Sequence, residues 1–491
     1  MKNLCLKVII IVLSLCKAAY ADRTTWYVHP DSALNTIQAG LDSCADNDTV
    51  LVGAGTYVEN LVWPNTLGIN LISELGPGAT IIDGGNTASV ISLDFDSLTH
   101  SATIRGFTIR NGNTAYGGGI FARGVVCYIL DNIISDNSAS CGGGIYAAVH
   151  SELAGLACHV HDNIISDNSA SHGGGIYFRG GPMIGPGSFE ISGNTITNND
   201  AVERGGGICT AQLQHTHINT NIITYNMASN GGGVFTDFSP DPENDIVTIS
   251  NNIINHNTAA EHGGGIGSVD TSSWGGVVDS VVGNIMVGNL AGYGGGVSAR
   301  MDYVYGNTIC DNSALHNGGA MEIWGGPSVV RCNEMTDNSA VNDVDGIYIH
   351  TWNSDEIIID SNDIYANGYG LYNPDTGFTV NAEHNWWGDA SGPYHPTANP
   401  GGLGDTVSDY VDFEPWLFWP VGVEEQPIAK PLETHETLHA TIFRGPLHLP
   451  EGKTCRVFDI TGRVVEPDKI TRGIYFVEID NKIVQKVVKI R

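Results

Sequence analysis

The 491-residue chain is poor in charged residues, and lysine is missing from most of it. Charged residues make up 15% of the sequence, and no lysine occurs between Lys17 and Lys430. Residues 22–425 hold 8 arginines against 45 acidic residues, which gives this region a net charge of −37. Nucleic acid is therefore excluded as a partner, because binding it depends on Lys and Arg displacing counterions. The scarcity of Glu, Lys and Arg also excludes a coiled-coil or disordered chain.

Long hydrophobic runs are absent beyond the first residues of the chain. Lys2 and Lys7 precede an apolar run over residues 8–15 and a small-x-small end, which is the pattern of a secretory signal peptide over residues 1–21. No later run approaches the roughly 18 apolar residues of a membrane-spanning helix. We therefore predict a secreted protein, extracellular or on the outer-membrane surface, with no transmembrane segment.

Glycine, by contrast, is abundant, with 63 residues, and much of it belongs to a repeat. The segment DNIISDNSAS occurs at residues 131–140 and again at 162–171, each time followed by a glycine triplet and an aliphatic residue. Nine coils share a turn asparagine, a β-branched residue three positions before it, and Ile or Met two positions after it. The turn asparagines are Asn132, Asn163, Asn194, Asn221, Asn252, Asn284, Asn307, Asn333 and Asn362.

Stacking one coil per repeat, at a rise of about 4.8 Å, turns each repeated position into a continuous column. Inward β-branched residues, and asparagines at turns that need left-handed geometry, predict an all-β chain forming a single right-handed parallel β-helix solenoid. A β-propeller needs blades of about 40 residues and a helical solenoid needs 3.6-residue periodicity, so both are excluded. Cys127 and Cys158 fall on inward positions of adjacent coils, which leaves open a disulfide or two stacked thiols.

Residues 25–420 resemble the pectin-lyase-like superfamily of secreted β-helix proteins. TIQAGLDSCADNDTVLVGAGTYVENL (36–61) is similar to the segment in which a helix caps the stack, and the glycine-triplet coils resemble polymorphic outer-membrane protein repeats. NWWGDASGPYHP (385–396) resembles the closing segment of bacterial members. The resemblance implies an N-terminal cap and first coils over 22–100, repeated coils over 101–380, and a closing segment over 381–420.

The C-terminal residues have a different composition. Residues 426–491 carry a net charge of +3, which predicts a domain boundary and a linker over 421–440. CRVFDITGRVV, RGIYFVEI and the terminal KVVKIR resemble a type A sorting domain of the type IX secretion system, and their alternating pattern predicts a small antiparallel β-sandwich over 441–491. The resemblance implies that type IX-like secretion machinery is a partner of this tail. A sandwich with no role in export is the alternative.

Insertions collect between each glycine triplet and the next turn asparagine, on one side of the coils, where solenoids usually bind ligands. Two outward columns lead into these loops. Aromatic rings suit stacking on sugars and arginines suit pairing with uronate or sulfate groups, so we predict binding of an extracellular polysaccharide or cell-surface glycan. Alternatively, the aromatic residues merely favour strands. The candidate ligand-binding residues are Phe121, Arg123, Tyr146, Tyr177, Phe235, Trp324 and Tyr348.

No known catalytic motif of the resembled enzymes occurs, neither the R-x-P-x-x-R of pectate lyases nor the motifs of pectin methylesterases and polygalacturonases. The best remaining pairs are Arg179 with Asp237, two coils or about 10 Å apart, and Arg300 with Glu322 on adjacent coils. An arginine base beside a carboxylate would suit a polysaccharide lyase acting on acidic glycans. We therefore hold three hypotheses open, a glycan-binding protein, such an enzyme, and a passive adhesin or surface spacer, each as a monomer.

The candidate metal site is a set of stacked aspartates. Asp131 stacks over Asp162 and Asp136 over Asp167, and like charges so close favour a cation such as Ca²⁺. The alternative is a solvated acidic edge with no ion, and the sequence requires no other cofactor. The His215 and His217 pair lacks companion ligands, so we interpret it as loop polarity.

Overall fold

A computed structural model describes residues 23–95, 100–148, 157–180, 188–211, 215–236, 246–268, 277–325, 328–342, 344–350, 357–421, 440–443, 447, 455–459, 464–467, 470, 473–479 and 482–489. The contacts between Cα atoms divide the chain into a unit ending at Gly422 and a unit beginning at Val423. The expected signal peptide and most of the expected linker lie outside the described residues.

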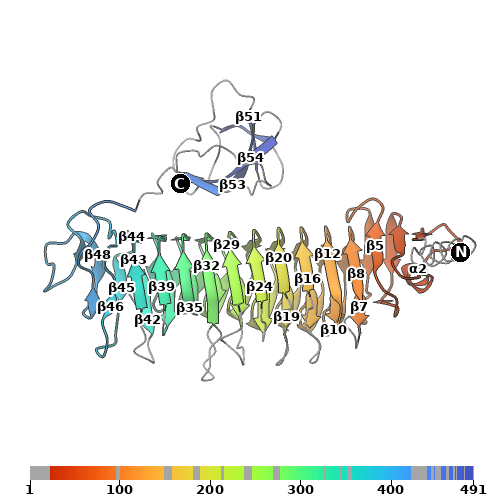
Figure 1. The fold of residues 1–491 in the computed structure, drawn as a ribbon, viewed down its shortest axis with the longest axis horizontal. Helices are drawn as coiled ribbons and strands as arrows, with labels where there is room; N and C mark the ends of the chain where they lie inside the picture. Colours follow the sequence, from red (N-terminus) through yellow and green to blue (C-terminus); the bar gives the residue numbers. More distant parts are fainter. Residues whose placement is uncertain are drawn as a thin grey trace, which may run out of the picture. The chain divides into compact units, whose positions relative to one another are not determined.

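The first unit is a parallel β-solenoid, in which the strands of each coil pair with parallel strands of the next (Figure 1). We name the faces of the solenoid sheets A, B, C and D. Along the chain, most coils contribute one strand to each in the order A, B, D, C. The predicted solenoid is therefore confirmed, and it contains almost no helix in its described part.

Sheet A is the longest face. Its strands are β1 (Thr25–Val28), β2 (Thr49–Val52), β5 (Ile69–Ser73), β8 (Ser101–Arg105), β12 (Val126–Leu130), β16 (Ala157–His161), β20 (Ser188–Ser192), β24 (His215–Asn219), β28 (Ile246–Ser250), β32 (Val277–Val282), β35 (Val297–Tyr305), β39 (Ser328–Arg331), β43 (Ile357–Asp360), β46 (Val380–Asn381) and β49 (Val411–Asp412).

Sheet B follows across a short turn. Its strands are β3 (Gly55–Val58), β6 (Thr80–Asp83), β9 (Thr108–Arg110), β13 (Ile133–Ser135), β17 (Ile164–Ser166), β21 (Thr195–Thr197), β25 (Ile222–Thr224), β29 (Ile253–Asn255), β33 (Ile285–Val287), β36 (Thr308–Cys310), β40 (Glu334–Thr336) and β44 (Asp363–Tyr365).

Sheet D precedes the glycine triplets. Its strands are β10 (Asn113–Tyr116), β14 (Ser138–Cys141), β18 (Ser169–His172), β22 (Asp200–Arg204), β26 (Met227–Asn230), β30 (Thr258–His262), β34 (Leu290–Ala291), β37 (Ser313–Ala314) and β41 (Ser339–Ala340).

Sheet C follows the triplets and leads into the insertions. Besides β35, which runs through both sheets C and A, its strands are β4 (Leu61–Val62), β7 (Ile91–Asp94), β11 (Ile120–Arg123), β15 (Ile145–Ala148), β19 (Ile176–Arg179), β23 (Ile208–Ala211), β27 (Val234–Thr236), β31 (Ile266–Gly267), β38 (Met321–Trp324), β42 (Ile347–His350), β45 (Tyr369–Tyr372), β47 (Pro393–Tyr394) and β48 (Gly404–Val407).

The hydrophobic core runs along the axis as columns of identical or similar residues. Ile129, Val160 and Ile191 pair in register on neighbouring strands of sheet A, and all three are fully buried. Burying an aliphatic side chain of this size stabilises the fold by about 1.5–3 kcal/mol. The repeated apolar position of the sequence is therefore the interior of the solenoid.

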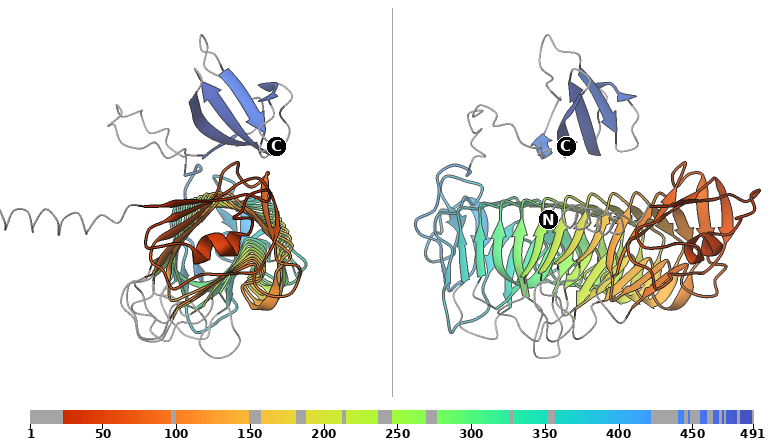
Figure 2. Two further views of the ribbon diagram at one scale, coloured as in Figure 1. Left: turned by 90° about the vertical axis from the view of Figure 1, so that its right-hand side faces the viewer. Right: turned by 45° about the vertical axis from the view of Figure 1, so that its right-hand side comes forward.

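A helix closes the N-terminal end of this core, as the resemblance implied. Helix α2 (Ile37–Asp42) packs against β1, β2 and β4 and lies across the end of the coils when viewed along the axis (Figure 2). Thr36 caps it, and the Glu59 carboxylate accepts hydrogen bonds from the backbone N–H groups of Ile37 and Gln38, each at 2.9 Å. These donors have no partner within a helix, so a carboxylate at this end stabilises it.

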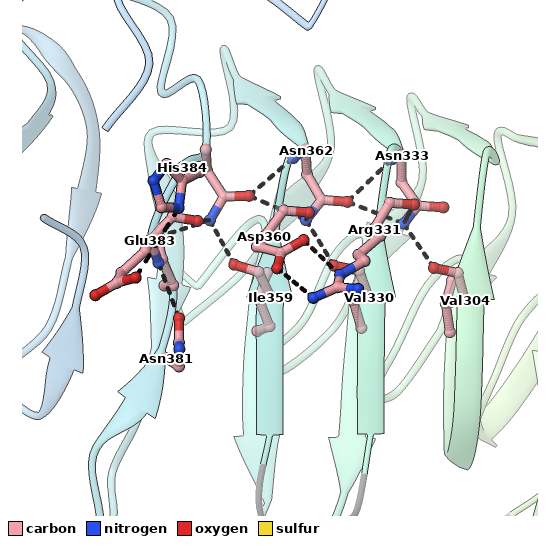
Figure 3. Close-up of polar contacts among 12 residues, drawn as sticks. Val304, Val330, Arg331, Asn333, Ile359, Asp360, Asn362, Asn381, Glu383 and His384 are labelled. Atoms are coloured by element: carbon pink, nitrogen blue, oxygen red, sulfur yellow. Dashed lines mark hydrogen bonds and ion pairs between the residues drawn. The ribbon is translucent and has the colours of Figure 1, made fainter. Parts of the chain in front are cut away.

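The turn asparagines form a buried ladder between sheets A and B, which continues to Asn385. Figure 3 shows two of its members, Asn333 and Asn362, on adjacent coils. Asn333 Nδ2 donates to the Val304 carbonyl of the preceding coil (3.1 Å) and to Asn362 Oδ1 of the next (2.9 Å). The residue before each asparagine takes the left-handed conformation, as at Ser361 (φ 57°). Each of these asparagines thus links its own coil to the coils before and after it through side-chain hydrogen bonds.

A second ladder lies between sheets B and D, and the repeat contains it as the second Asn of DNIISDNSAS. Its asparagines are Asn137, Asn168, Asn199, Asn226, Asn257, Asn289, Asn312, Asn338 and Asn367. Asp405 ends it, since Asp405 Oδ2 accepts from both the backbone nitrogen and Nδ2 of Asn367, each at 3.0 Å.

Glycine is favoured in the triplets for two reasons. The first residue has a positive φ, and the backbone of the neighbouring coil lies very close to the next two residues. Gly173 has a φ of +63°. A Cβ added to Gly174 would lie 2.6 Å from the backbone oxygens of Asp200 and Gly206, and one added to Gly175 would lie 2.6 Å from that of Gly207. Since backbone atoms cannot move aside as a flexible side chain can, glycine is favoured here, although Ala320 occupies the third position in one coil.

Cys127 and Cys158 form a disulfide between β12 and β16, with their Cα atoms 4.8 Å apart. The structure thus decides between the two states that the sequence left open. The bond joins adjacent coils inside the core, where both residues are buried.

The described strands of the second unit form one five-stranded sheet in the order β50 (Ala440–Phe443), β54 (Lys482–Lys489), β53 (Gly473–Ile479), β51 (Cys455–Asp459) and β52 (Val464–Val465). β50 and β54 run parallel, while the other pairs are antiparallel. The predicted antiparallel sandwich is therefore not confirmed. Among the described residues of the whole chain, no helix is long and apolar enough to cross a membrane.

Replacing one rung of the first ladder should destabilise the solenoid. Asn252 Oδ1 accepts from the backbone nitrogen of Asn221 (2.9 Å), and Asn252 Nδ2 donates to the Ile218 carbonyl (2.8 Å). Asn252→Ala leaves both backbone groups buried without these partners, so we expect a loss of about 2–5 kcal/mol of unfolding free energy in denaturant titrations. Asn113→Ala, at an exposed asparagine of β10, should change it by less than about 0.5 kcal/mol. Equal unfolding midpoints for the two variants would contradict a structural role of the ladder.

Candidate functional site

The predicted first outward column exists on sheet C. Phe121, Tyr146 and Tyr177 pair in register on β11, β15 and β19. Their rings stack on one another, with centroids 5.6 Å apart in both steps and interplanar angles of 14° and 9°. Much of each ring face is thus occupied by a neighbouring ring, and Tyr146 is 6% exposed.

Further along the same column, Phe235 of β27 is fully buried, and the Arg204 guanidinium lies 5.4 Å from its ring centroid. Tyr348 of β42 is half-buried and stacks on Tyr372 of β45, with centroids 6.0 Å apart. A role of these aromatic residues in ligand binding stays a prediction, and the full burial of Phe235 leaves that residue no surface for a ligand.

The second outward column contains one arginine with an ionic partner and two without one among the described residues. Arg123 forms a bidentate pair with Asp94, at 2.6 and 2.9 Å, so its charge is balanced within the protein. Arg179 and Arg300 are exposed and form no ion pair with any described residue. The Arg179 guanidinium lies beside Tyr146, where it opposes the rise in the pKa of the tyrosine that burial causes.

The other arginines of the body are mostly paired. Arg105 contacts Asp131 at 2.8 Å, Arg110 contacts Asp83 at 3.0 Å, and Arg331 contacts Asp360 at 2.6 Å (Figure 3). In each case the partner lies on a neighbouring coil. Among the described residues, arginines without an ionic partner therefore occur at two points of this column, Arg179 at the end of β19 and Arg300 in β35.

The two predicted catalytic pairs have different outcomes. Asp237 lies outside the described residues, so its position relative to Arg179 stays untested. Arg300 and Glu322 do lie on adjacent coils, as predicted, because Ser298 of β35 pairs with Glu322 of β38. Glu322 belongs to the first outward column, however, and it contacts His262, Ser298 and His350.

Glu322 is the centre of a buried polar cluster that the sequence did not predict. Its side chain is 0% exposed and its Oε2 accepts a hydrogen bond from Ser298 Oγ at 2.6 Å. His262 Nδ1 lies 3.1 Å from the same oxygen, and His350 Nδ1 lies 3.5 Å from Oε1. Side chains from four successive coils, including His262 at the end of strand β30, thus meet around this cluster.

The electrostatics of the cluster favour the ionised carboxylate. Burial alone would raise the pKa of Glu322, but the nearby His262 and His350 imidazoles and the hydrogen bond from Ser298 outweigh it and lower the pKa to about 2. A buried carboxylate requires such partners, since an unpaired charge in the interior is costly.

Aromatic residues surround the two imidazoles. Trp324 Nε1 donates to Ser298 Oγ (3.2 Å), and its ring stacks on His350 with centroids 3.8 Å apart. His262 stacks on Tyr293. The His262 side chain is 13% exposed and that of His350 is 33% exposed, so solvent reaches His350 more readily.

The local sequence explains how these groups meet. Gly267 and Ser298 occupy the two positions of the first outward column before Glu322, and their small size leaves room beside the carboxylate. His262 ends β30 and directly precedes a glycine triplet, whose turn places it next to sheet C. A search for charged residues directly before the triplets could have found His262, whereas its pairing with Glu322, two coils on, needs the structure.

The four candidate calcium ligands have conformational roles of their own. Asp131, Asp136, Asp162 and Asp167 all have positive φ, between 54° and 58°, immediately before ladder asparagines. Asp residues tolerate this conformation better than most. In the described part of the chain no three of these carboxylates come within ligand distance of one another, and calcium binding stays untested.

The predicted interpretation of His217 as loop polarity is wrong. The structure places it in β24, on the strand that pairs with β20. Its register partner is Glu190, a companion that lies 27 residues earlier in the sequence and was therefore missed.

A comparison with protein families agrees with the observed fold. Residues 119–309 match the family model described as right handed beta helix region. The fold is a right-handed parallel β-helix. A search of curated protein sequences gives no match. A similar solved structure is described as a mannuronic acid specific polysaccharide family 6 lyase from human gut microbiota, with 12% identity, a TM-score of 0.36, and coverage of 76% of this chain and 89% of that one.

The Glu322 cluster should make stability depend on pH in the acid range. The folded pKa of about 2 is below the value of about 4.3 in an unfolded chain, so the stabilisation is complete above about pH 4.5 and is lost as the pH falls toward 2. We expect about 3 kcal/mol to be lost, as measured by denaturant unfolding at a series of pH values.

Glu322→Gln should lose this dependence because its side chain cannot ionise. Glu203→Gln, at an exposed carboxylate of sheet D, should keep it. A wild-type profile parallel to that of Glu322→Gln between pH 5 and pH 2 would refute the assignment.

Proposed function

We propose that this β-helix is an exported protein that binds an acidic polysaccharide along the insertion-bearing face of sheet C. The observation that carries the proposal is the pair of exposed arginines, Arg179 and Arg300, which have no ionic partner among the described residues on a strongly acidic body. Guanidinium groups pair well with carboxylate and sulfate groups, so these two positions can hold an anionic ligand on a body that otherwise repels it.

The spacing of the two arginines supports an extended ligand. Four coils separate them, which corresponds to about 19 Å at the rise of parallel strands. A ligand contacting both must therefore run along the solenoid axis. Tyr177 and Tyr348, which are half-buried, belong to the first outward column of the same face.

Removing either arginine should weaken binding of a polyuronate. We expect Arg179→Ala and Arg300→Ala each to lower the affinity about tenfold in calorimetric titrations with polyuronates and sulfated glycans, because each loses a charge-assisted hydrogen bond. Arg331→Ala, on sheet A and paired with Asp360, is the control and should keep the affinity. Equal affinities for all four proteins, or no binding to any acidic glycan, would contradict the proposal.

A second candidate function is cleavage of the same class of glycan, and the Glu322 cluster favours it. His350 is solvent-accessible and its Nδ1 faces a buried carboxylate, an arrangement that orients an imidazole for general acid–base chemistry. Arg300 precedes Trp324 and His350 in the second outward column, where it would meet a uronate carboxylate.

The two functions are distinguished by product formation. If the chain is a lyase, acidic polysaccharides should yield products with ultraviolet absorbance from a new double bond, and His350→Ala should lower the rate at least a hundredfold without abolishing binding. His172→Ala, a histidine on sheet D, should keep the rate. Retained binding with no product from any acidic glycan would exclude this second function.

Export is the remaining part of the proposal. The apolar run of residues 8–15 supports passage into the secretory route, and the basic tail supports recognition by type IX-like machinery. The protein would then act outside the cell or on the outer-membrane surface.

A further inference from the structure

A separate group of potential metal ligands lies on sheet A, away from the columns described for sheet C. His159 and His161 are two residues apart in β16, so their side chains point to the same face of the strand. Glu190 of β20 pairs in register with His159 on the next coil. All three side chains are half-buried.

The donor atoms of this group converge. Glu190 Oε2 lies 3.4 Å from His159 Nδ1 and 3.7 Å from His161 Nε2, and all three atoms lie within 4.8 Å of one another. These distances exceed the usual 2.7–3.2 Å of an N–H···O hydrogen bond. Two ligands bound to one tetrahedral ion at about 2.0–2.1 Å would be about 3.4 Å apart. The 3.4 Å contact between His159 and Glu190 is a long hydrogen bond that also matches the separation of two ligands on one ion, and small side-chain movements would bring all three donor atoms to such an ion.

The neighbouring residues orient the two rings. His161 Nδ1 lies 2.5 Å from Ser192 Oγ, which leaves Nε2 directed toward Glu190. His159 stacks on Tyr128, with centroids 4.9 Å apart and an interplanar angle of 4°. Metal-binding histidines generally use the second ring nitrogen in this way, since a hydrogen bond there fixes the tautomer and the ring orientation.

We propose that His159, His161 and Glu190 form a binding site for a divalent transition-metal ion, with Zn²⁺ as the best-fitting ion. Two imidazoles and one carboxylate suit Zn²⁺ and leave a fourth position for water. Ca²⁺ does not fit, because it takes oxygen ligands. The site lies on a different sheet from the proposed glycan face and does not depend on that function.

The experiment is a calorimetric titration of the full chain, purified without a histidine tag and treated with EDTA, using ZnCl₂ alone. We expect one equivalent to bind, and we expect both His161→Ala and Glu190→Gln to lower the affinity at least a hundredfold. His172→Ala is the matched control. His172 also lies near a glutamate, Glu203, at 3.6 Å, but among the described residues no third ligand joins this pair. The His172→Ala variant should therefore bind Zn²⁺ like the wild type.

Two further measurements separate a ligand role from an effect on folding. Ser192→Ala keeps all three ligands and should weaken Zn²⁺ binding about 10- to 100-fold, because the His161 ring loses its orienting contact. Circular dichroism of each variant before titration should match that of the wild type. Co²⁺ in place of Zn²⁺ should give the visible absorption of a tetrahedral site, and Glu190→Gln should lose it. Equal Zn²⁺ binding by the wild type and Glu190→Gln, or no stoichiometric binding, would overturn the proposal.

Discussion

The hydrogen bond from one coil to the next is the constraint on which the rest of the molecule depends. Every strand of the body must present its N–H and C=O groups to a neighbour in register, since a buried backbone group without a partner is costly. The turns between sheets interrupt this pattern, and there the side-chain amides of the two asparagine ladders replace it. Glycine triplets serve the same constraint, because they allow backbones to approach where a Cβ would collide.

This constraint explains why the fold could be predicted from the sequence. Each coil must repeat the hydrogen-bonding groups of its neighbour, so the asparagines, the β-branched core positions and the glycines recur at matching places. The same reasoning placed Phe121, Tyr146 and Tyr177 in one column. It could not show that their rings would stack on each other, because ring orientation depends on side-chain packing rather than on register.

The candidate sites were less predictable for a related reason. Register identifies residues that pair on adjacent coils, but His262 reaches Glu322 from another sheet and from two coils away. The space for that contact comes from the small residues Gly267 and Ser298, and Ser298 also donates a hydrogen bond to Glu322. The sheet A histidines carried a stronger signal, since two histidines two residues apart must share a face of a strand. Aligning that strand with the following coil would have placed Glu190 beside them.

The types of polar side chain on the solenoid differ from one sheet to another. Sheet A carries imidazoles near one carboxylate, while sheet C carries guanidinium groups and the buried Glu322 cluster. Since the core between them consists of aliphatic columns, each face can change its outward residues without altering the interior. A repeated scaffold of this kind permits independent sites on its different sheets.

The continuity of β35 across the corner between sheets C and A gives Arg300 a particular property. Its backbone nitrogen donates to Ser268 Oγ at 3.1 Å on the preceding coil, and its Cα pairs with Val277 in sheet A. The stem of this side chain therefore starts from an ordered strand rather than from the end of an insertion. Contact with an anion would then restrict side-chain torsions alone, so the entropic cost of binding at this position is smaller than at a loop residue.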